Sequence, residues 1–221
     1  MCVRYVLHKG DLYDWVEKIV ARRGERPTRT VEEIVYRDVM EAFPGERGTI
    51  ALIRDGELRI EQATWGLQPH WAKEESYGKK RAYNARSETL LEKPTFTPAF
   101  RRRRCLIPAT GFYERADGRW LLVEPTEPAP MAFAGLYEEP NKWSEIPTYT
   151  MVTTTPNETI AEVHDRMPVV LDPDDYEAWL DLDRPAEELR GLLVPARPEL
   201  LTVQDAGPIG KPKMAEAPSL F

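Results

Sequence analysis

The chain has few of the residues from which covalent frameworks and metal sites are built. Its 221 residues include two cysteines, Cys2 and Cys105, and three histidines. Two thiols 103 positions apart form no disulfide framework and indicate a reducing compartment. The histidines and cysteines also show no zinc-binding spacing. We therefore expect neither a metal ion nor another cofactor.

Long hydrophobic runs are also missing. No apolar stretch approaches the ~20 residues of a membrane-spanning helix. The first residues, MCVRYVLHKGD, lack the charged, apolar and cleavage regions of a signal peptide. Hydrophobic residues make up 42% of the chain and charged residues 30%, which is ordinary for a soluble protein. We expect a cytoplasmic monomer without membrane association.

Acidic residues outnumber basic ones, and the net charge is −7. Residues 79–104 nevertheless carry nine basic side chains and two acids, a net charge of +7 that leaves −14 on the rest of the chain. This basic segment ends in four consecutive arginines. The asymmetry predicts a local basic surface suited to nucleic acid. The alternative is a solvated loop or helix end.

Turn residues and hydrophobic alternation predict strands joined by short connections. Asp55-Gly56 and Ala116-Asp117-Gly118 each mark a hairpin. A helix is predicted over residues 12–20, with Asp11 as its N-cap and Gly24 as its end. The predicted strands are residues 50–54, 57–65, 120–124, 131–138 and 148–155. Short helices are expected from Thr155-Pro156, Asp172-Pro173 and Arg184-Pro185 onward.

Short connections between strands favour a mostly antiparallel α+β fold over a doubly wound one. We expect a single domain over residues 1–204. Residues 205–221 are rich in Pro, Gly, Ala and Lys and are predicted to be a C-terminal tail.

Cys2 directly follows the initiator methionine, which is generally removed before a small side chain. The mature chain would then carry a thiol and an α-amine on adjacent carbons. The α-amine titrates near pH ~8, well below lysine at ~10.4. With an aldehyde, the amine forms a Schiff base and the thiol closes a five-membered thiazolidine. With an acyl group, the thiol is an N-terminal nucleophile. The alternative is that Cys2 only begins a buried first strand.

Six segments stand out together along the chain. They are MCVRY (1–5), WGLQPHW (65–71), YNARSET (83–89), RCLIPATGFYER (104–115), AGLYE (134–138) and VHDRMPVVL (163–171). In this order they closely resemble the SOS response-associated peptidase family, whose members process abasic sites in DNA. The resemblance implies a barrel-like core. It also implies that mature Cys2 attacks the ring-opened aldehyde of an abasic site in single-stranded DNA, forming a thiazolidine crosslink that shields the site.

The resemblance implies three further catalytic residues beside Cys2. Glu114 would carry protons during imine formation and thiol addition, and His164 would assist opening of the sugar. Asn84 would hold the deoxyribose or orient the Cys2 amine. In isolation each has a simpler explanation: a salt-bridged strand residue, a structural histidine and a turn residue.

The DNA-binding residues implied by the resemblance are arginines and tryptophans. Arg4, Arg86 and Arg166 match positions that contact phosphates, where guanidinium groups form bidentate bonds. Each could instead pair with a carboxylate, such as that of Asp165. Trp65 and Trp71 would stack on unpaired bases, although we expect one of them to be a core anchor. A chain bound in this way would be nucleoid-associated.

The chain departs from the family pattern in three places. Val3 replaces the usual glycine, and Arg115 stands where a tryptophan is common. The segment before the first hairpin is poorly matched, with Pro44 in EAFPG (41–45) as its nearest equivalent. We expect Val3 to narrow the backbone approach beside Cys2 and Arg115 to exchange stacking for phosphate contact.

Two other functions remain open at this point. One is an N-terminal-nucleophile thiol peptidase, including self-removal of Met1, with hydrolase or lyase chemistry. The other is a non-catalytic module that binds single-stranded nucleic acid. The basic segment and the paired tryptophans favour DNA over a peptide substrate, and a plain binding module would give Glu114 and His164 no purpose.

Overall fold

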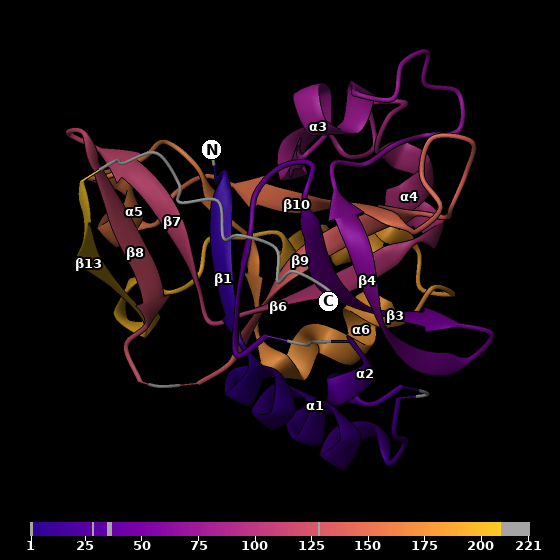
Figure 1. Cartoon of the computed structure of the whole chain (residues 1–221), viewed down its shortest axis with the longest axis horizontal. Coiled ribbons are helices and arrows are strands. Elements are labelled where there is room, and N and C mark those ends of the chain that lie inside the picture. The colour runs from indigo at the N-terminus through magenta and orange to yellow at the C-terminus, as the bar shows by residue number, and fades with distance from the viewer. Residues whose placement is uncertain (1, 28, 35–36, 128, 209–221) are drawn as a thin grey trace, which may run out of the picture.

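The structure is a computed structural model, and it describes residues 2–27, 29–34, 37–127 and 129–208. Figure 1 shows sheets in the centre with short helices around them. The smaller sheet is antiparallel and has the strand order β13-β8-β7-β1-β2. Its strands are β1 (Arg4–His8), β2 (Val39–Ala42), β7 (Gly111–Ala116), β8 (Arg119–Pro125) and β13 (Leu201–Pro208).

The larger sheet has the order β11-β10-β4-β3-β6-β9-β12, with β5 beside β10. Its strands are β3 (Arg47–Arg54), β4 (Glu57–Trp65), β5 (Asn84–Arg86), β6 (Arg104–Ala109), β9 (Met131–Glu138), β10 (Thr148–Thr154), β11 (Met167–Pro168) and β12 (Val170–Leu171). Since β9 also pairs with β10, the pairings from β10 through β4, β3, β6 and β9 return to β10. Only the pairings of β10 with β4 and β5 are parallel in the described part of the chain. The α+β class is confirmed.

The helices are short, apart from the first. The α-helices are α1 (Lys9–Arg23), α2 (Val31–Ile34), α3 (Tyr77–Arg81), α4 (Thr97–Arg102), α5 (Glu158–Ala161) and α6 (Tyr176–Leu180). The 3₁₀ turns are η1 (Ser87–Thr89), η2 (Pro173–Asp175), η3 (Ala186–Leu192) and η4 (Pro198–Leu200). Helical segments therefore begin close to the three predicted prolines, Pro156, Pro173 and Pro185. Two of them open 3₁₀ turns, and α5 begins one residue after Asn157, whose Oδ1 accepts from the Ile160 amide.

Both predicted hairpins are confirmed. The turn between β3 and β4 has Asp55 at φ 56° and Gly56 at φ 82°. The turn between β7 and β8 has Asp117 at φ 49° and Gly118 at φ 74°. Two-residue turns with positive φ match the right-handed twist of the flanking strands, and Asp and Gly tolerate that conformation. The β7–β8 hairpin is the one that carries Glu114.

Helix α1 begins earlier than predicted. Its N-cap is His8, and Asp11 lies inside the first turn, so the prediction of Asp11 as the N-cap is wrong. The Asp11 carboxylate instead accepts a hydrogen bond from the Thr110 hydroxyl. The predicted end is confirmed, because Gly24 adopts φ 71° and donates its amide to the Val20 carbonyl.

The buried side chains form two clusters. The first lies under α1 and α6 and includes Trp15 and Trp179. The second includes residues from both sheets, among them Tyr5 and Trp65, and it contains Cys2 with 0% exposure. The N-terminal end of β1 is therefore part of the core (Figure 1).

The basic segment is not one surface. The Arg104 side chain is fully buried and donates to the carbonyls of Trp179 at 2.7 Å and Phe100 at 2.9 Å. Arg103 pairs with Glu138 at 2.8 Å. Two of the four consecutive arginines thus stabilise the fold, because buried carbonyl groups and a carboxylate need donors.

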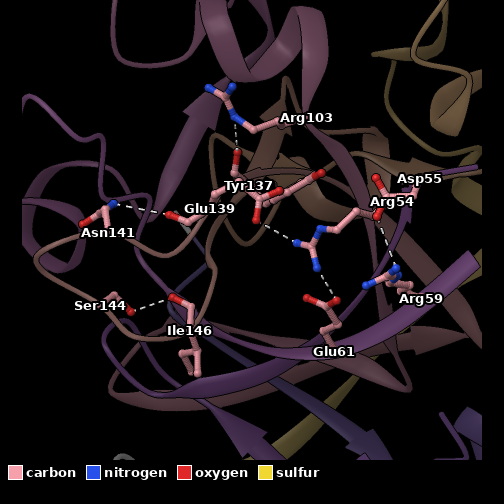
Figure 2. A network of polar contacts seen from close by, with 10 residues as sticks. All are labelled: Arg54, Asp55, Arg59, Glu61, Arg103, Tyr137, Glu139, Asn141, Ser144 and Ile146. Carbon is pink, nitrogen blue, oxygen red and sulfur yellow. Dashed lines mark hydrogen bonds and ion pairs between the residues drawn. The ribbon is translucent and has the colours of Figure 1, made fainter. Parts of the chain in front are cut away.

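A surface network attaches the loop after β9 to the β3–β4 hairpin. Figure 2 shows Arg54 between Glu61 of β4 and Glu139 of the loop. The Glu139 carboxylate lies 2.8 Å from the Arg54 guanidinium. Within the same loop, the Ser144 hydroxyl donates to the Ile146 carbonyl at 2.7 Å. Exposed ion pairs contribute only about 0–1 kcal/mol each, so this network orders the loop more than it stabilises the fold.

The predicted tail begins too early. Strand β13 continues to Pro208 and pairs with β8, and Asp205 forms an ion pair with Arg119 at 2.6 Å. The remainder of the predicted tail lies outside the described residues. In the described ranges, no helix has the length and apolar character needed to cross a membrane. The same ranges contain no group of three or more His, Cys, Asp or Glu residues placed to hold a metal.

Candidate active site

Cys2 lies two residues before β1 and is fully buried. Its carbonyl oxygen accepts a hydrogen bond from Asn84 Nδ2 at 2.7 Å. Its Sγ lies 3.5 Å from the Arg4 carbonyl, a weak contact. These contacts fix the backbone on which removal of Met1 would expose an α-amine. The prediction that Cys2 only begins a buried strand describes its burial, but leaves the Asn84 contact unexplained.

Glu114 reaches the same place from β7. That strand pairs with β1 in the register Arg4 with Tyr113 and Tyr5 with Phe112. Because side chains alternate along a strand, Glu114 lies on the same face as buried Phe112. The Glu114 side chain is 2% exposed, and burial raises the pKa of its carboxyl to about 7. The group therefore exchanges protons near neutral pH.

The Cys2 thiol is held in its protonated form. Burial raises its pKa well above the usual value, and the charge of Glu114 raises it further. Since the thiolate is the nucleophile, this thiol needs a base to remove its proton as it reacts. Glu114 is the acid whose charge acts on it.

His164 follows α5, and its amide donates to the Ile160 carbonyl at 2.8 Å. Its Nε2 lies 4.0 Å from Glu114 Oε2. Burial lowers the pKa of His164 while it raises that of Glu114, so both shifts favour neutral groups. Near pH 7 the Glu114 carboxyl is therefore close to its midpoint while burial favours the neutral imidazole, so the contact is not a fixed ion pair. A reacting group that contacts both side chains would have an acid and a base within reach.

Asn84 comes from β5, which is parallel to β10 with Asn84 opposite Met151. Its Nδ2 is used by Cys2, and its Oδ1 is buried without a hydrogen bond to any described residue. A buried acceptor without a donor is costly unless a ligand satisfies it. The four predicted catalytic residues thus come from four segments and meet around the N-terminal end of β1.

Arg4 is held by aromatic rings and a carboxylate. Its guanidinium lies over the Tyr113 ring at 4.0 Å and near the Trp120 ring at 5.2 Å. Its Nη2 donates to Glu41 of β2 at 2.6 Å. A phosphate would therefore compete with Glu41 for Arg4.

Arg166 pairs with a carboxylate, which is the alternative to phosphate contact that the sequence leaves open. It is 8% exposed, and its two terminal nitrogens bind both oxygens of Glu88, at 2.6 and 3.0 Å. It also donates to the Thr153 carbonyl at 2.7 Å. The guanidinium is thus occupied inside the protein, with Glu88 as its partner and not Asp165. Arg86 is exposed and forms no ion pair with any described residue.

The two tryptophans differ as expected, and Trp65 is the core anchor. It is 0% exposed, stacks on Tyr149 at 6.3 Å and donates its Nε1 to the Tyr83 carbonyl at 2.6 Å. Its ring is therefore not placed for a base to stack on it. Trp71 is 44% exposed and contacts the Tyr77 ring at its edge.

A comparison with protein-family models matches residues 1–207 to SRAP, the SOS response associated peptidase family. The chain belongs to this family. It is 42% identical over 145 residues to the abasic site processing protein YoqW of Bacillus subtilis, a match that covers 60% of this chain and 62% of the relative. It is 41% identical over 155 residues to YoaM of the same organism, with 66% and 68% covered. It is 31% identical over 214 residues to HMCES of Gallus gallus, with 79% and 64% covered.

Two solved structures share the fold of this chain. A crystal structure from Bacteroides thetaiotaomicron has a TM-score of 0.75 at 25% identity and covers 92% of this chain and 91% of its own. One from Bordetella bronchiseptica has a TM-score of 0.73 at 25% identity, with 92% and 99% covered. The fold is thus shared with solved structures over most of the length of the chain.

Sequence reasoning missed the partners in this SRAP site. Glu41 and Glu88 neutralise two of the predicted arginines, and Trp120 is shared between Arg4 and Arg115, the latter 4.4 Å from its ring. The Arg115 guanidinium therefore covers the ring of Trp120 on the neighbouring strand β8. Glu88 lies inside the quoted motif YNARSET, whereas Glu41 lies in the poorly matched segment.

Replacing Glu88 by glutamine is expected to destabilise the SRAP fold. The change removes one charge from a pair in which Arg166 is buried and Glu88 half-exposed, so the free energy of unfolding should fall by about 1–2 kcal/mol, less than for a fully buried pair. Urea unfolding of Glu88→Gln and of a surface control, Glu17→Gln, measures this. Equal stability of the two variants would contradict the structural role of the Arg166–Glu88 pair.

Proposed function

We propose that this SRAP chain recognises abasic sites in single-stranded DNA and links them covalently to Cys2 once Met1 is removed. Its relatives YoqW, YoaM and HMCES are named abasic site processing proteins. The observation that carries the proposal is the buried thiol of Cys2 together with the Glu114 carboxyl that acts on it. The thiol is held in its protonated form, and the pKa of the Glu114 carboxyl is about 7. This pair suits an addition reaction in which a thiol proton must move near neutral pH.

The chemistry divides into two steps. The α-amine of Cys2 adds to the aldehyde carbon of the opened sugar, and loss of the hydroxyl as water leaves an imine. Sulfur then adds to the same carbon, its proton leaves, and the imine nitrogen gains a proton. The product is a thiazolidine, and one water is released in total. Neither step needs an oxidant or a metal.

Glu114 serves both steps in order. In its protonated form it donates to the departing hydroxyl, and the resulting carboxylate accepts the thiol proton. A carboxyl whose pKa lies near the working pH can both donate and accept a proton at a small cost in free energy. His164, on the far side of Glu114, is assigned to opening of the closed sugar and to reversal. Asn84 holds the Cys2 carbonyl and offers its buried Oδ1 to a sugar hydroxyl or to the amine.

DNA contact would come from fewer residues than the sequence suggests. Arg86 is exposed and available to a phosphate, and Arg4 becomes available if Glu41 is displaced. Trp71 offers a partly exposed ring to an unpaired base. Arg166 supports the site from within and does not meet the phosphates.

A gel assay tests the proposal. The chain lacking Met1 is incubated with a single-stranded oligonucleotide carrying one abasic site, and the products are boiled and separated under denaturing conditions. A heat-stable shifted band without borohydride treatment is the expected result. A band seen only after borohydride indicates an imine alone, and no band at all overturns the crosslinking function. Cleavage of added peptides would favour the thiol peptidase.

Replacing Glu41 by glutamine is expected to strengthen binding to single-stranded DNA. The change leaves Arg4 without a competing carboxylate, and the affinity should rise about 2- to 5-fold, the range set by a partly exposed ion pair. The dependence of log affinity on log salt should also steepen by about 0.7, for one more phosphate contact on a single strand. Fluorescence anisotropy at several salt concentrations measures both quantities.

The matched control is Glu17→Gln, which removes an exposed carboxylate of α1 that pairs with Arg26. It should leave both quantities unchanged. If Glu41→Gln binds no better than this control, Arg4 does not contact a phosphate.

A further inference from the structure

His164 Nδ1 has two neighbours that require opposite positions of its proton. The Arg166 amide donates to Nδ1 at 3.0 Å, which needs a lone pair on that nitrogen. Asp165 Oδ1 lies 2.8 Å from the same nitrogen, which needs a proton there. Because a ring nitrogen is either a donor or an acceptor, the two contacts cannot both be hydrogen bonds at once.

Each contact belongs to one charge state of the ring. In the neutral ring, the proton lies on Nε2, which faces Glu114 at 4.0 Å, and Nδ1 accepts from the Arg166 amide. In the protonated ring, both nitrogens carry protons, and Nδ1 lies 2.8 Å from the Asp165 carboxylate, whose charge favours that state. The Arg166 amide thus favours the neutral ring, and Asp165 favours the protonated ring.

We propose that Asp165 is a positioning residue that stabilises the protonated form of His164 and thereby sets the pH at which Nε2 delivers a proton into the site. The effect of Asp165 on reversal of the crosslink rests on the proposed function. Reversal breaks the C–S bond, the electron pair stays on sulfur, and a proton must reach that sulfur. Water then hydrolyses the imine and restores the aldehyde and the amine.

The other charged groups around His164 act in both directions. On β7, Glu114 is neutral or charged according to its pKa of about 7, and the Cys2 thiol stays neutral through burial. The Arg166 guanidinium is turned to Glu88 and Thr153. Burial lowers the pKa of His164, and the charge of Asp165 raises it. Asp165 therefore offsets part of the lowering of the His164 pKa by burial. A positively charged α-amine on Cys2 would lower that pKa again.

The effect of Asp165 is moderate because water reaches it. Its side chain is 82% exposed, so solvent screens its charge. We expect Asp165→Asn to lower the pKa of His164 and to slow release of the crosslink at pH 6 by about 2- to 5-fold, the range of a partly screened ion pair. Formation of the crosslink at pH 8, where His164 is neutral in both proteins, should not change.

An NMR titration of the histidine side chains tests the proposal without DNA. The chain has three histidines, so His8 and His70 serve as internal references and His164→Gln assigns the third signal. Asp165→Asn should move the His164 midpoint to lower pH, and Asp165→Glu should restore it in part. The control Glu162→Gln removes an exposed acid two residues from His164 that no described contact joins to Nδ1.

An unchanged His164 midpoint in Asp165→Asn would overturn the proposal, as would an equal shift in Glu162→Gln. These outcomes are separate from the failure of the proposed function. If the wild-type chain forms no crosslink but the titration shifts as expected, the crosslinking function fails and the role of Asp165 stands.

Discussion

Cys2→Ala is expected to abolish the heat-stable link to abasic DNA completely. The thiazolidine needs sulfur and nitrogen on the same residue, and alanine keeps only the amine. Met1 is still removed before alanine, so the α-amine can form an imine that borohydride traps. A denaturing gel with and without borohydride separates these products, and the expected outcome is a band in the trapped sample only.

Cys105→Ala is the matched control, because Cys105 is the chain's second cysteine and is also fully buried. It should keep the heat-stable band. A band that survives boiling without borohydride in Cys2→Ala would rule out a thiazolidine at the N-terminus.

Glu114→Gln is expected to slow crosslinking by about 10²-fold or more, the usual scale for general acid–base catalysis. The amide keeps the size of the side chain and removes the titrating group. In the wild type, the rate of thiol addition should rise with pH through about 7, as Glu114 becomes the carboxylate that accepts the proton. The variant should lose that rise. Single-turnover rates between pH 5 and pH 9 measure both effects.

The same substitution slows the reaction but is expected to raise the free energy of unfolding at pH 8. The folded-state pKa of Glu114 is raised from 4.5 to about 7, so its stabilising contribution is complete below pH 4.5 and is lost as the pH rises through about 7. Glu114→Gln does not ionise, and at pH 8 it should exceed the wild type in free energy of unfolding by about 2–3 kcal/mol. A variant that is slower but no more stable at pH 8 would place the carboxyl in a more solvated position.

His164→Gln should affect release more than formation. A crosslink, once made, should persist longer in this variant, because the proton donor for reversal is missing. Transfer of the link to a competing abasic oligonucleotide measures release. If His164→Gln transfers as fast as the wild type, His164 has no part in reversal.

Local features of the fold could be predicted from the sequence. The Asp-Gly turns adopt positive φ whatever surrounds them, and Gly24 ends α1 for the same reason. β9 and β10 are buried along their whole length, and their β-branched and aromatic residues predict strands. The resemblance supplied the residues of the site, and the structure brings Cys2, Asn84, Glu114 and His164 together.

Long-range pairings could not be predicted. Nothing near Arg4 or Arg166 in the sequence identifies Glu41, 37 residues away, or Glu88, 78 residues away, as its partner. The burial of Trp65 depends on Tyr149 from a distant strand. The raised pKa of the Cys2 thiol likewise depends on packing between two sheets. Asp11 failed as an N-cap because Thr110, 99 residues away, takes its carboxylate.

Peptide mapping by mass spectrometry gives the most direct test of the linkage at Cys2. The chain lacking Met1 is allowed to react with an abasic oligonucleotide, the DNA is digested to the linked sugar, and the protein is cleaved into peptides. The expected result is a single modified peptide that begins at Cys2 and carries the mass of the sugar fragment minus one water, with neither a free thiol nor a free amine on that residue. A modification on a lysine or on Cys105, or equal modification of a chain that retains Met1, would contradict the proposed chemistry.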